Sequence, residues 1–249
     1  MLYRRISPVA ALAALSLLSM LAACSNDNTT SPNNNTARIR VVNASSSTTG
    51  LNATAGSTSL SSGLNFQNTN MAASCVSIPA GTQSLNFTSG SSSTSIGSVT
   101  NYNFQAGQSY TVVYYGNNNV QVYPETYTAP GSGNYAVRFI NATGNAGNIF
   151  VTAPGASISS TATPNVSNLA SNSVSGFNSS TATGGTFTTY ASGSNMARMF
   201  GTTANPNTAT PAGSYTLSSP STTGAQTVVF TSANASNSNA TAFQVNSCQ

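Results

Sequence analysis

The chain has no histidine and almost no charge. Only 3% of its 249 residues are charged, all six basic residues are arginines, and the acids are Asp27 and Glu125 alone. General acid–base catalysis needs a group with a tunable pKa at the substrate, usually His, Glu or Asp. A serine nucleophile needs a neighbouring His or Lys base. The composition therefore argues against an enzyme.

The same scarcity argues against metal sites and nucleic-acid binding. Zinc sites use several Cys or His ligands, and calcium sites use several carboxylates. Binding of nucleic acid depends on many Lys or Arg side chains gathered on one surface, and here the arginines are few and scattered. We expect no cofactor, no metal, no small-molecule substrate and no nucleic-acid partner.

No apolar run reaches the roughly 20 residues that a membrane-spanning helix needs. The run at 9–21 follows a positively charged start and fits the apolar centre of a signal peptide. It leads into Leu21-Ala22-Ala23-Cys24, which resembles the cleavage box of bacterial lipoprotein precursors. We predict that residues 1–23 are removed as a signal peptide and that Cys24 carries the lipid. The alternative is an ordinary secretory signal, with Cys24 as a chance thiol.

The residue after the cysteine is Ser25 and not Asp, which by resemblance to Gram-negative lipoproteins implies release to the outer membrane. The membrane is then the first expected partner, reached through acyl chains, and the expected location is the cell envelope. Residues 25–36 have no apolar side chain to bury, so 24–36 is expected to be a lipidated cysteine with a flexible tether.

Cysteine counting suggests one disulfide. With Cys24 lipidated, Cys75 and Cys248 remain, in a compartment where disulfides persist. A bridge would pin the C-terminal end to the first half of the chain and stabilise the fold by up to about 5 kcal/mol. The alternative is two buried, unpaired thiols. We favour the bridge because exposed free thiols are reactive.

Two segments alternate apolar and polar residues, and they match each other. Residues 37–44 read ARIRVVNA and residues 136–143 read AVRFINAT. Aligned on Asn43 and Asn141, the two segments match Arg40 with Arg138. This alternation predicts half-buried strands. Two copies of a unit of about a hundred residues suit small β-sandwiches.

Other segments repeat in the same order. A Pro-Ala-Gly turn occurs at 79–81 and 211–213, and uneven spacing predicts an insertion in the second copy around 181–210. Helical periodicity is missing, and short β-branched and aromatic runs lie between Asn, Gly and Ser turns. We predict an all-β fold with tandem sandwich domains at 37–128 and 134–249.

The opening strand ARIRVVNAS, the Pro-Ala-Gly turn and the segment AGQSYTVVYYG resemble the bacterial family known as domain of unknown function 4397. The resemblance covers nearly all of residues 37–249, with a more divergent second copy. Members often continue the opening strand with Ser-Pro-Asp, which residues 45–47 and 143–145 replace here. The resemblance implies immunoglobulin-like sandwich domains in exported or surface proteins, and it implies no activity or site residues.

Four residues are candidates for a binding surface. Arg38 and Arg40 lie two apart on one strand and share a face, where they either form a small anion patch or keep an edge strand soluble. Tyr114 and Tyr115 must face opposite sides of a strand, so one of them is expected to be exposed. Such a ring could stack on a sugar or a partner, or it could pack against a neighbouring strand.

These observations predict a membrane-anchored cell-envelope lipoprotein that acts as a non-catalytic structural or binding module. The competing hypothesis is a surface adhesin, or a carbohydrate- or protein-binding module, that engages envelope polysaccharide or protein through exposed tyrosines. A concave groove lined by exposed tyrosines would favour the second hypothesis. A convex surface of Ser and Thr would favour the first.

Overall fold

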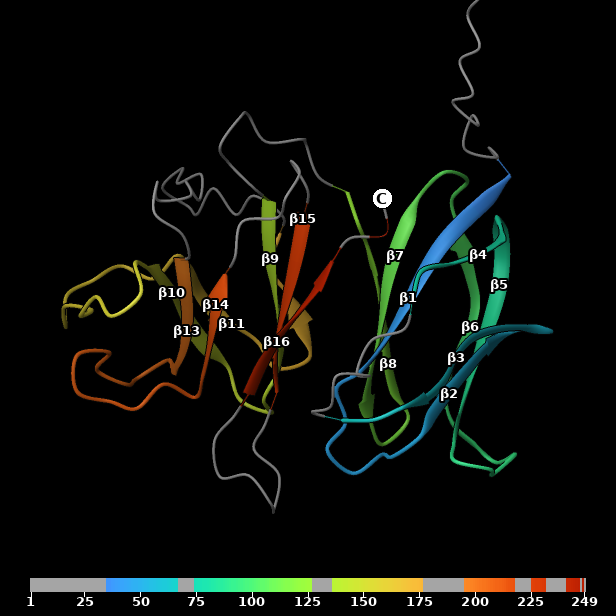
Figure 1. Ribbon diagram of the computed structural model, residues 1–249, viewed down its shortest axis with the longest axis horizontal. Coiled ribbons are helices and arrows are strands. Elements are labelled where there is room, and N and C mark those ends of the chain that lie inside the picture. The colour runs from blue at the N-terminus through green and yellow to red at the C-terminus, as the bar shows by residue number, and fades with distance from the viewer. Residues whose placement is uncertain are drawn as a thin grey trace, which may run out of the picture. The chain divides into compact units, whose positions relative to one another are not determined.

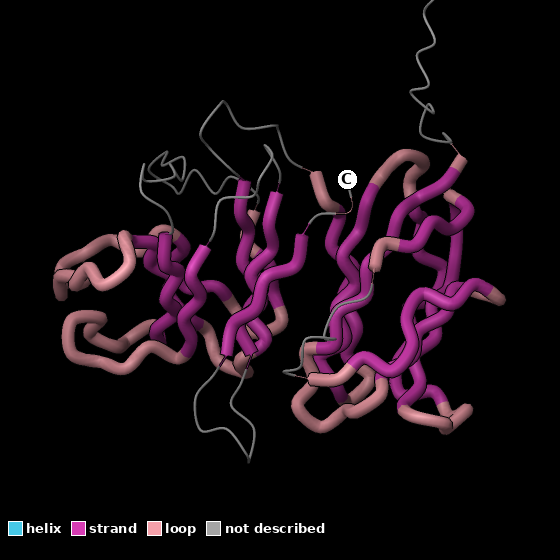
Figure 2. Tube along the Cα trace, in the orientation of Figure 1, coloured by secondary structure: helices cyan, strands magenta, loops and turns pink. Residues whose placement is uncertain are grey.

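Strands form all the regular structure described by the computed structural model, which covers residues 35–66, 74–126, 136–176, 195–217, 225–231, 241–246 and 248. The expected all-β fold is confirmed (Figure 2). The signal peptide, Cys24 and nearly all of the tether lie outside these residues. Within them, no helix has the length and apolarity to span a bilayer.

The first half of the chain forms two four-stranded sheets (Figure 1). Inner sheet 1 has the order β4-β1-β7-β8, and outer sheet 1 has the order β3-β2-β5-β6. In chain order the strands are β1 (Thr36–Asn43), β2 (Leu51–Ala55), β3 (Thr58–Leu64), β4 (Val76–Pro79), β5 (Gly81–Ser89), β6 (Ser95–Phe104), β7 (Ser109–Gly116) and β8 (Asn119–Pro124).

The second half repeats this arrangement. Inner sheet 2 has the order β12-β9-β15-β16, and outer sheet 2 has the order β11-β10-β13-β14. The strands are β9 (Ala136–Ala142), β10 (Gly147–Thr152), β11 (Val166–Leu169), β12 (Ser173–Val174), β13 (Asn195–Gly201), β14 (Gly213–Leu217), β15 (Ala225–Thr231) and β16 (Thr241–Asn246).

Adding eight to each strand number of the first half gives the strand order of the second half. The register repeats as well, because β1 and β9 each run parallel to the seventh strand of their half. Arg40 pairs with Thr111 in the first half, as Arg138 pairs with Thr227 in the second. The sequence repeat is therefore also a repeat of topology.

The expected insertion at 181–210 is interrupted by a strand. β13 occupies 195–201 and corresponds to β5, so extra residues are found after it, at 202–212. The part at 181–194 lies outside the described residues.

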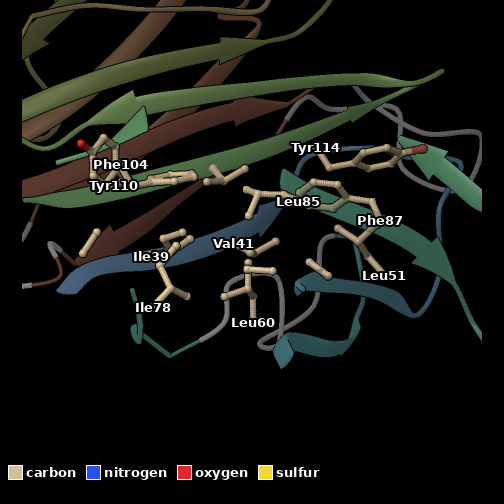
Figure 3. Packing of buried hydrophobic residues seen from close by; sticks show 14 of the residues in the cluster. Ile39, Val41, Leu51, Leu60, Ile78, Leu85, Phe87, Phe104, Tyr110 and Tyr114 are labelled. Carbon is tan, nitrogen blue, oxygen red and sulfur yellow. The ribbon is translucent and has the colours of Figure 1, made fainter. Parts of the chain in front are cut away.

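Each half buries an apolar core between its two sheets. In the first half, Ile39 and Val41 of β1 face Leu85 and Phe87 of β5 across the sandwich (Figure 3). In the second half, Phe139 of β9 has the equivalent place. Burying such side chains contributes roughly 1.5–3 kcal/mol each, which is why these short strands stay paired.

The prediction of half-buried opening strands was wrong. Every residue of β9 is buried, and in β1 only Arg38 is exposed. Alternation predicts one covered face, but both faces of these strands are covered, since a second apolar cluster lies on the side away from the core. Central strands buried on both faces read as nearly continuous apolar runs.

A buried asparagine at the end of each opening strand explains part of the sequence repeat. Asn43 Nδ2 donates to Thr48 O (2.9 Å) and Leu64 O (3.0 Å), and its Oδ1 accepts from Ser45 N (3.0 Å). Asn141 makes the same pattern of bonds to its own loop and to the end of β11. The side chain thus fixes the turn that leads from one sheet to the other.

We expect Asn43→Ala to lower the free energy of unfolding by roughly 2–4 kcal/mol, because it leaves three buried backbone groups without their partner. Asn43→Asp should also destabilise, since it replaces two donors by acceptors. Urea unfolding measures both. The exposed Asn103→Ala serves as control and should change stability by no more than about 0.5 kcal/mol. An Asn43 variant no less stable than this control would contradict the assigned role.

Candidate functional site

The two candidate tyrosines do not form an exposed surface. Tyr114 is only 3% exposed, belongs to the first core and stacks on Phe87 with ring centroids 6.0 Å apart. Tyr115 points to the other side of β7, as expected, but is half-buried there, and its hydroxyl lies 2.9 Å from that of Tyr123. The expectation that one ring is exposed was therefore wrong, because both faces of β7 are covered.

The two candidate arginines share a face, but their surroundings differ. Arg38 is exposed, whereas Arg40 is half-buried and donates from Nε (3.3 Å) and Nη2 (2.9 Å) to Cys75 Sγ. Burial lowers the pKa of Arg40, and the Glu125 carboxylate opposes this. The edge-strand explanation was wrong, since β1 lies between β4 and β7.

The face that carries Arg40 packs against the second half of the chain. An apolar cluster, which we call the apolar junction, joins inner sheet 1 to inner sheet 2. It uses corresponding positions from both halves. Its buried members are Val42, Ala44, Val113 and Tyr123 from the first half and Ile140, Ala142, Val229 and Val245 from the second.

Next to this cluster lies a buried carboxylate. Glu125 follows β8 and is 3% exposed. Its Oε1 accepts a hydrogen bond from Thr111 Oγ1, and its Oε2 accepts one from Cys248 N at 2.8 Å. Arg138 Nη2 lies 3.8 Å from Oε1. One side chain thus connects β7, β9 and the C-terminal end.

Arg138 is the cationic partner and is 2% exposed. Its Nη1 donates to Pro124 O (2.9 Å) across the two halves, and its Nε donates to Thr227 Oγ1 (3.0 Å) within inner sheet 2. Burial lowers the pKa of Arg138 to about 10, while Glu125, Tyr123 and Tyr115 raise it. Groups from both sandwiches therefore stabilise the positive charge of Arg138.

Cys75 and Cys248 are joined by a disulfide, with Cα atoms 5.6 Å apart. Ser109 Oγ also donates to Cys248 O at 2.9 Å. The end of the second sandwich is thereby fixed to the start of β4 in the first. We call Arg40, Cys75, Thr111, Glu125, Arg138, Thr227 and Cys248 the polar junction.

Sequence reasoning did not identify Glu125 and Arg138 as a pair. The two residues lie 13 positions apart, on opposite sides of the expected domain boundary, and no motif connects them. The available signal was the correspondence of Arg138 with Arg40 together with the scarcity of other charges, which leaves Arg138 few possible counter-ions.

The polar junction connects the two sandwiches through bonds between groups of the protein itself. Each Glu125 oxygen already accepts a bond from the protein, so neither is presented to a substrate. Among the described residues, no three His, Cys, Asp or Glu side chains lie close enough to hold a metal ion. The arrangement fixes one sandwich on the other.

The comparison with protein families gives one match. Residues 37–152 are similar to the family described as a domain of unknown function (DUF4397). This range runs from β1 to the end of β10, so it covers the first sandwich and the opening strands of the second. The resemblance expected through residue 249 is found only as far as residue 152. No curated protein matches the chain.

We expect Glu125→Ala to lower the free energy of unfolding by about 3–5 kcal/mol, since it leaves the Arg138 guanidinium buried without its counter-ion. The double variant Glu125→Leu with Arg138→Met removes both charges and should recover most of the loss. Chemical denaturation of Glu125→Ala, of the double variant and of its two single variants, Glu125→Leu and Arg138→Met, measures this. If the double variant lost the sum of the two single effects, the two side chains would not be coupled.

Stability should fall as pH rises above about 10. Burial raises the pKa of Tyr115 and of Tyr123, so the folded chain keeps protons that the unfolded chain releases. The stability from these groups is complete below pH 10 and is lost above it. Arg138, with its lowered pKa, acts in the opposite direction, so the test compares the parent protein with Tyr115→Phe. The variant should show a shallower loss between pH 9 and 11; equal slopes would contradict the assignment.

Proposed function

We propose that this protein is an exported lipoprotein, held at a cell-envelope membrane by acyl chains on Cys24, and that its two joined sandwiches act there as a non-catalytic structural or binding module. The expected signal peptide and cleavage box supply the sequence argument. The structural argument comes from how the sandwiches are connected.

The disulfide between Cys75 and Cys248 is the observation that carries the proposal. Disulfides persist in oxidising compartments and are rare in the cytosol. This one closes a loop with a sequence separation of 173 residues, which contains every described strand from β4 to β16. A protein that depends on such a bridge is suited to an exported location.

The contacts between the two sandwiches favour a rigid arrangement of one on the other. The apolar junction, the Glu125–Arg138 pair and the disulfide all connect the same two inner sheets or their ends. Residues 34–249 form one compact unit. Domains held only by a linker move relative to each other by default, whereas a large apolar interface opposes such motion.

The surface favours a structural module over a tyrosine-lined binding site. Tyr114 lies in the core, and Tyr115 is bonded to Tyr123. The outward face of outer sheet 1 instead carries exposed Ser, Thr and Asn side chains. They include Thr82, Ser84, Asn86, Ser98, Thr100 and Asn103.

Replacing Cys24 by Ser should release the protein from membranes and abolish incorporation of labelled fatty acid, since the modified sulfur is lost. Fractionation with a carbonate wash measures release, and mass spectrometry of the N-terminal peptide measures the lipid. Ser25→Ala is the matched control and should remain lipidated.

Membrane association of the Cys24→Ser variant after carbonate washing would contradict the lipid-anchor proposal. The released Cys24→Ser chain also allows a direct binding screen. Specific micromolar binding to an envelope polysaccharide or protein would define the module as a binding body, and its absence would leave the structural role.

A further inference from the structure

The two halves share strand order and register, but they differ on the outward face of the outer sheets. In outer sheet 1, Thr54 pairs with Asn86, and both are polar. In outer sheet 2, the corresponding pair is Phe150 and Arg198. Thr88 likewise corresponds to Phe200. The first half thus presents this face to solvent, and the second half carries large side chains that need a cover.

Two long loops supply that cover. Residues 153–165 join β10 to β11, where the first half has only the turn Gly56–Ser57, and residues 202–212 join β13 to β14. In Figure 1 they are the yellow and orange loops beside outer sheet 2. They leave from opposite ends of the β10–β13 pair, since Thr152 pairs with Met196 and Gly147 pairs with Gly201.

A small core attaches these loops to the sheet. Phe150 and Phe200 are 5% and 2% exposed, meet edge to face with ring centroids 5.8 Å apart, and pack with Ile158 of the first loop. Ala162, Ala204 and Ala209 from the loops pack against them. Arg198 Nη2 donates to Thr152 Oγ1 (2.9 Å) and Ala156 O (2.6 Å). The loops therefore have a fixed position although they form no strand.

The exposed side chains of both loops are mostly hydroxyls, with Asn205 and Asn207 in the second loop and prolines interspersed in both. Neither loop contains a charged or aromatic residue. Every Ser and Thr in them is exposed: Ser157, Ser159, Ser160, Thr161 and Thr163 in the first, and Thr202, Thr203, Thr208 and Thr210 in the second. Exposed Ser and Thr with Pro are the composition of O-glycosylated segments. A site that binds sugar would instead present aromatic faces for stacking.

Backbone pairing separates these hydroxyls from those on the strands of outer sheet 1, and the prolines separate them from the exposed loop Ser91–Thr94, which has none. Thr82, Ser84, Ser98 and Thr100 are also exposed, but they lie on β5 and β6, whose backbones are paired with each other. A transferase must draw an acceptor segment into its own cleft, and a strand within a sheet cannot leave without breaking the ladder. At Ser157–Thr163 and Thr202–Thr210 the backbone belongs to no ladder. Its hydrogen bonds there are local turns, such as Ala162 N to Ser159 O and Thr208 N to Asn205 O, so the segment can be drawn out without breaking a sheet.

We propose that loops 153–165 and 202–212 are acceptor sites for O-linked glycans. The hydroxyl oxygen of a Ser or Thr attacks the anomeric carbon of a lipid- or nucleotide-linked sugar phosphate. A glycosidic C–O bond forms and the anomeric carbon–phosphate oxygen bond breaks. The phosphate leaves with the bonding electrons, and the hydroxyl proton passes to a base of the transferase. The proposal rests on the export proposed above, which brings the chain to an envelope transferase.

The test uses the full chain purified from the cells that naturally produce it. Because the loops contain no Lys or Arg, the protein is digested with a protease that cuts at small apolar residues, and the peptides are mapped by mass spectrometry with fragmentation that retains sugars. Peptides from 153–165 and 202–212 are expected to carry hexose or N-acetylhexosamine mass increments.

A matched pair of variants makes the assignment specific. Replacing Ser157, Ser159, Ser160, Thr161 and Thr163 by Ala should remove the sugar from the first loop and leave the melting temperature within a few degrees of the parent, because these side chains are exposed. The control replaces Thr82, Ser84, Ser98 and Thr100 by Ala and should leave the loop sugars unchanged.

The N-terminal peptide of the same sample reports on export. Unmodified loops, or sugar confined to other segments, on a chain with lipidated Cys24 would overturn the acceptor assignment alone. Unmodified loops on a chain that retains residues 1–23 would overturn both this assignment and the proposed export.

Discussion

The structure depends on one buried carboxylate. Glu125 receives bonds from Thr111 and from the backbone of Cys248, and it faces Arg138. A buried ion pair adds little net stability over apolar side chains of the same size, but losing one partner is costly. We therefore expect the pair to act mainly on the specificity of packing. Two inner sheets held by apolar contacts alone could slide along each other. The contact between Glu125 and Arg138 forms in one relative position of the two sheets.

The apolar junction shows how duplication solves a burial problem. Val42, Val113, Ile140 and Val229 occupy corresponding places in the two inner sheets and lie in one cluster. A two-fold homodimer likewise buries one patch against a second copy of itself. Here both copies belong to one chain, so association costs no encounter between molecules. This explains why central strands such as β9 are buried throughout.

The sequence was sufficient to predict the fold class and the internal repeat, because period-two patterning and turn residues are local. It was insufficient for Tyr114, Arg40 and the role of Glu125. Alternation separates the two faces of a strand, but it does not say whether the second face meets water or another sheet. For β1 and β7 that face is covered by residues about a hundred positions later. The loop at 153–165 escaped prediction for a related reason, since its anchor, Phe200, is distant in sequence.

The disulfide also determines how the protein carries mechanical tension. A pull between the start of β1 and the C-terminal end would pass from Thr36 to Cys75, cross the sulfur bridge to Cys248 and leave the chain there. The stretch between the two cysteines is bypassed by this covalent route. Among the described strands, β1, β2 and β3 precede Cys75 and carry the load. A stretched molecule can therefore lengthen by unravelling those three strands, while the covalent path of the force leaves out the second sandwich.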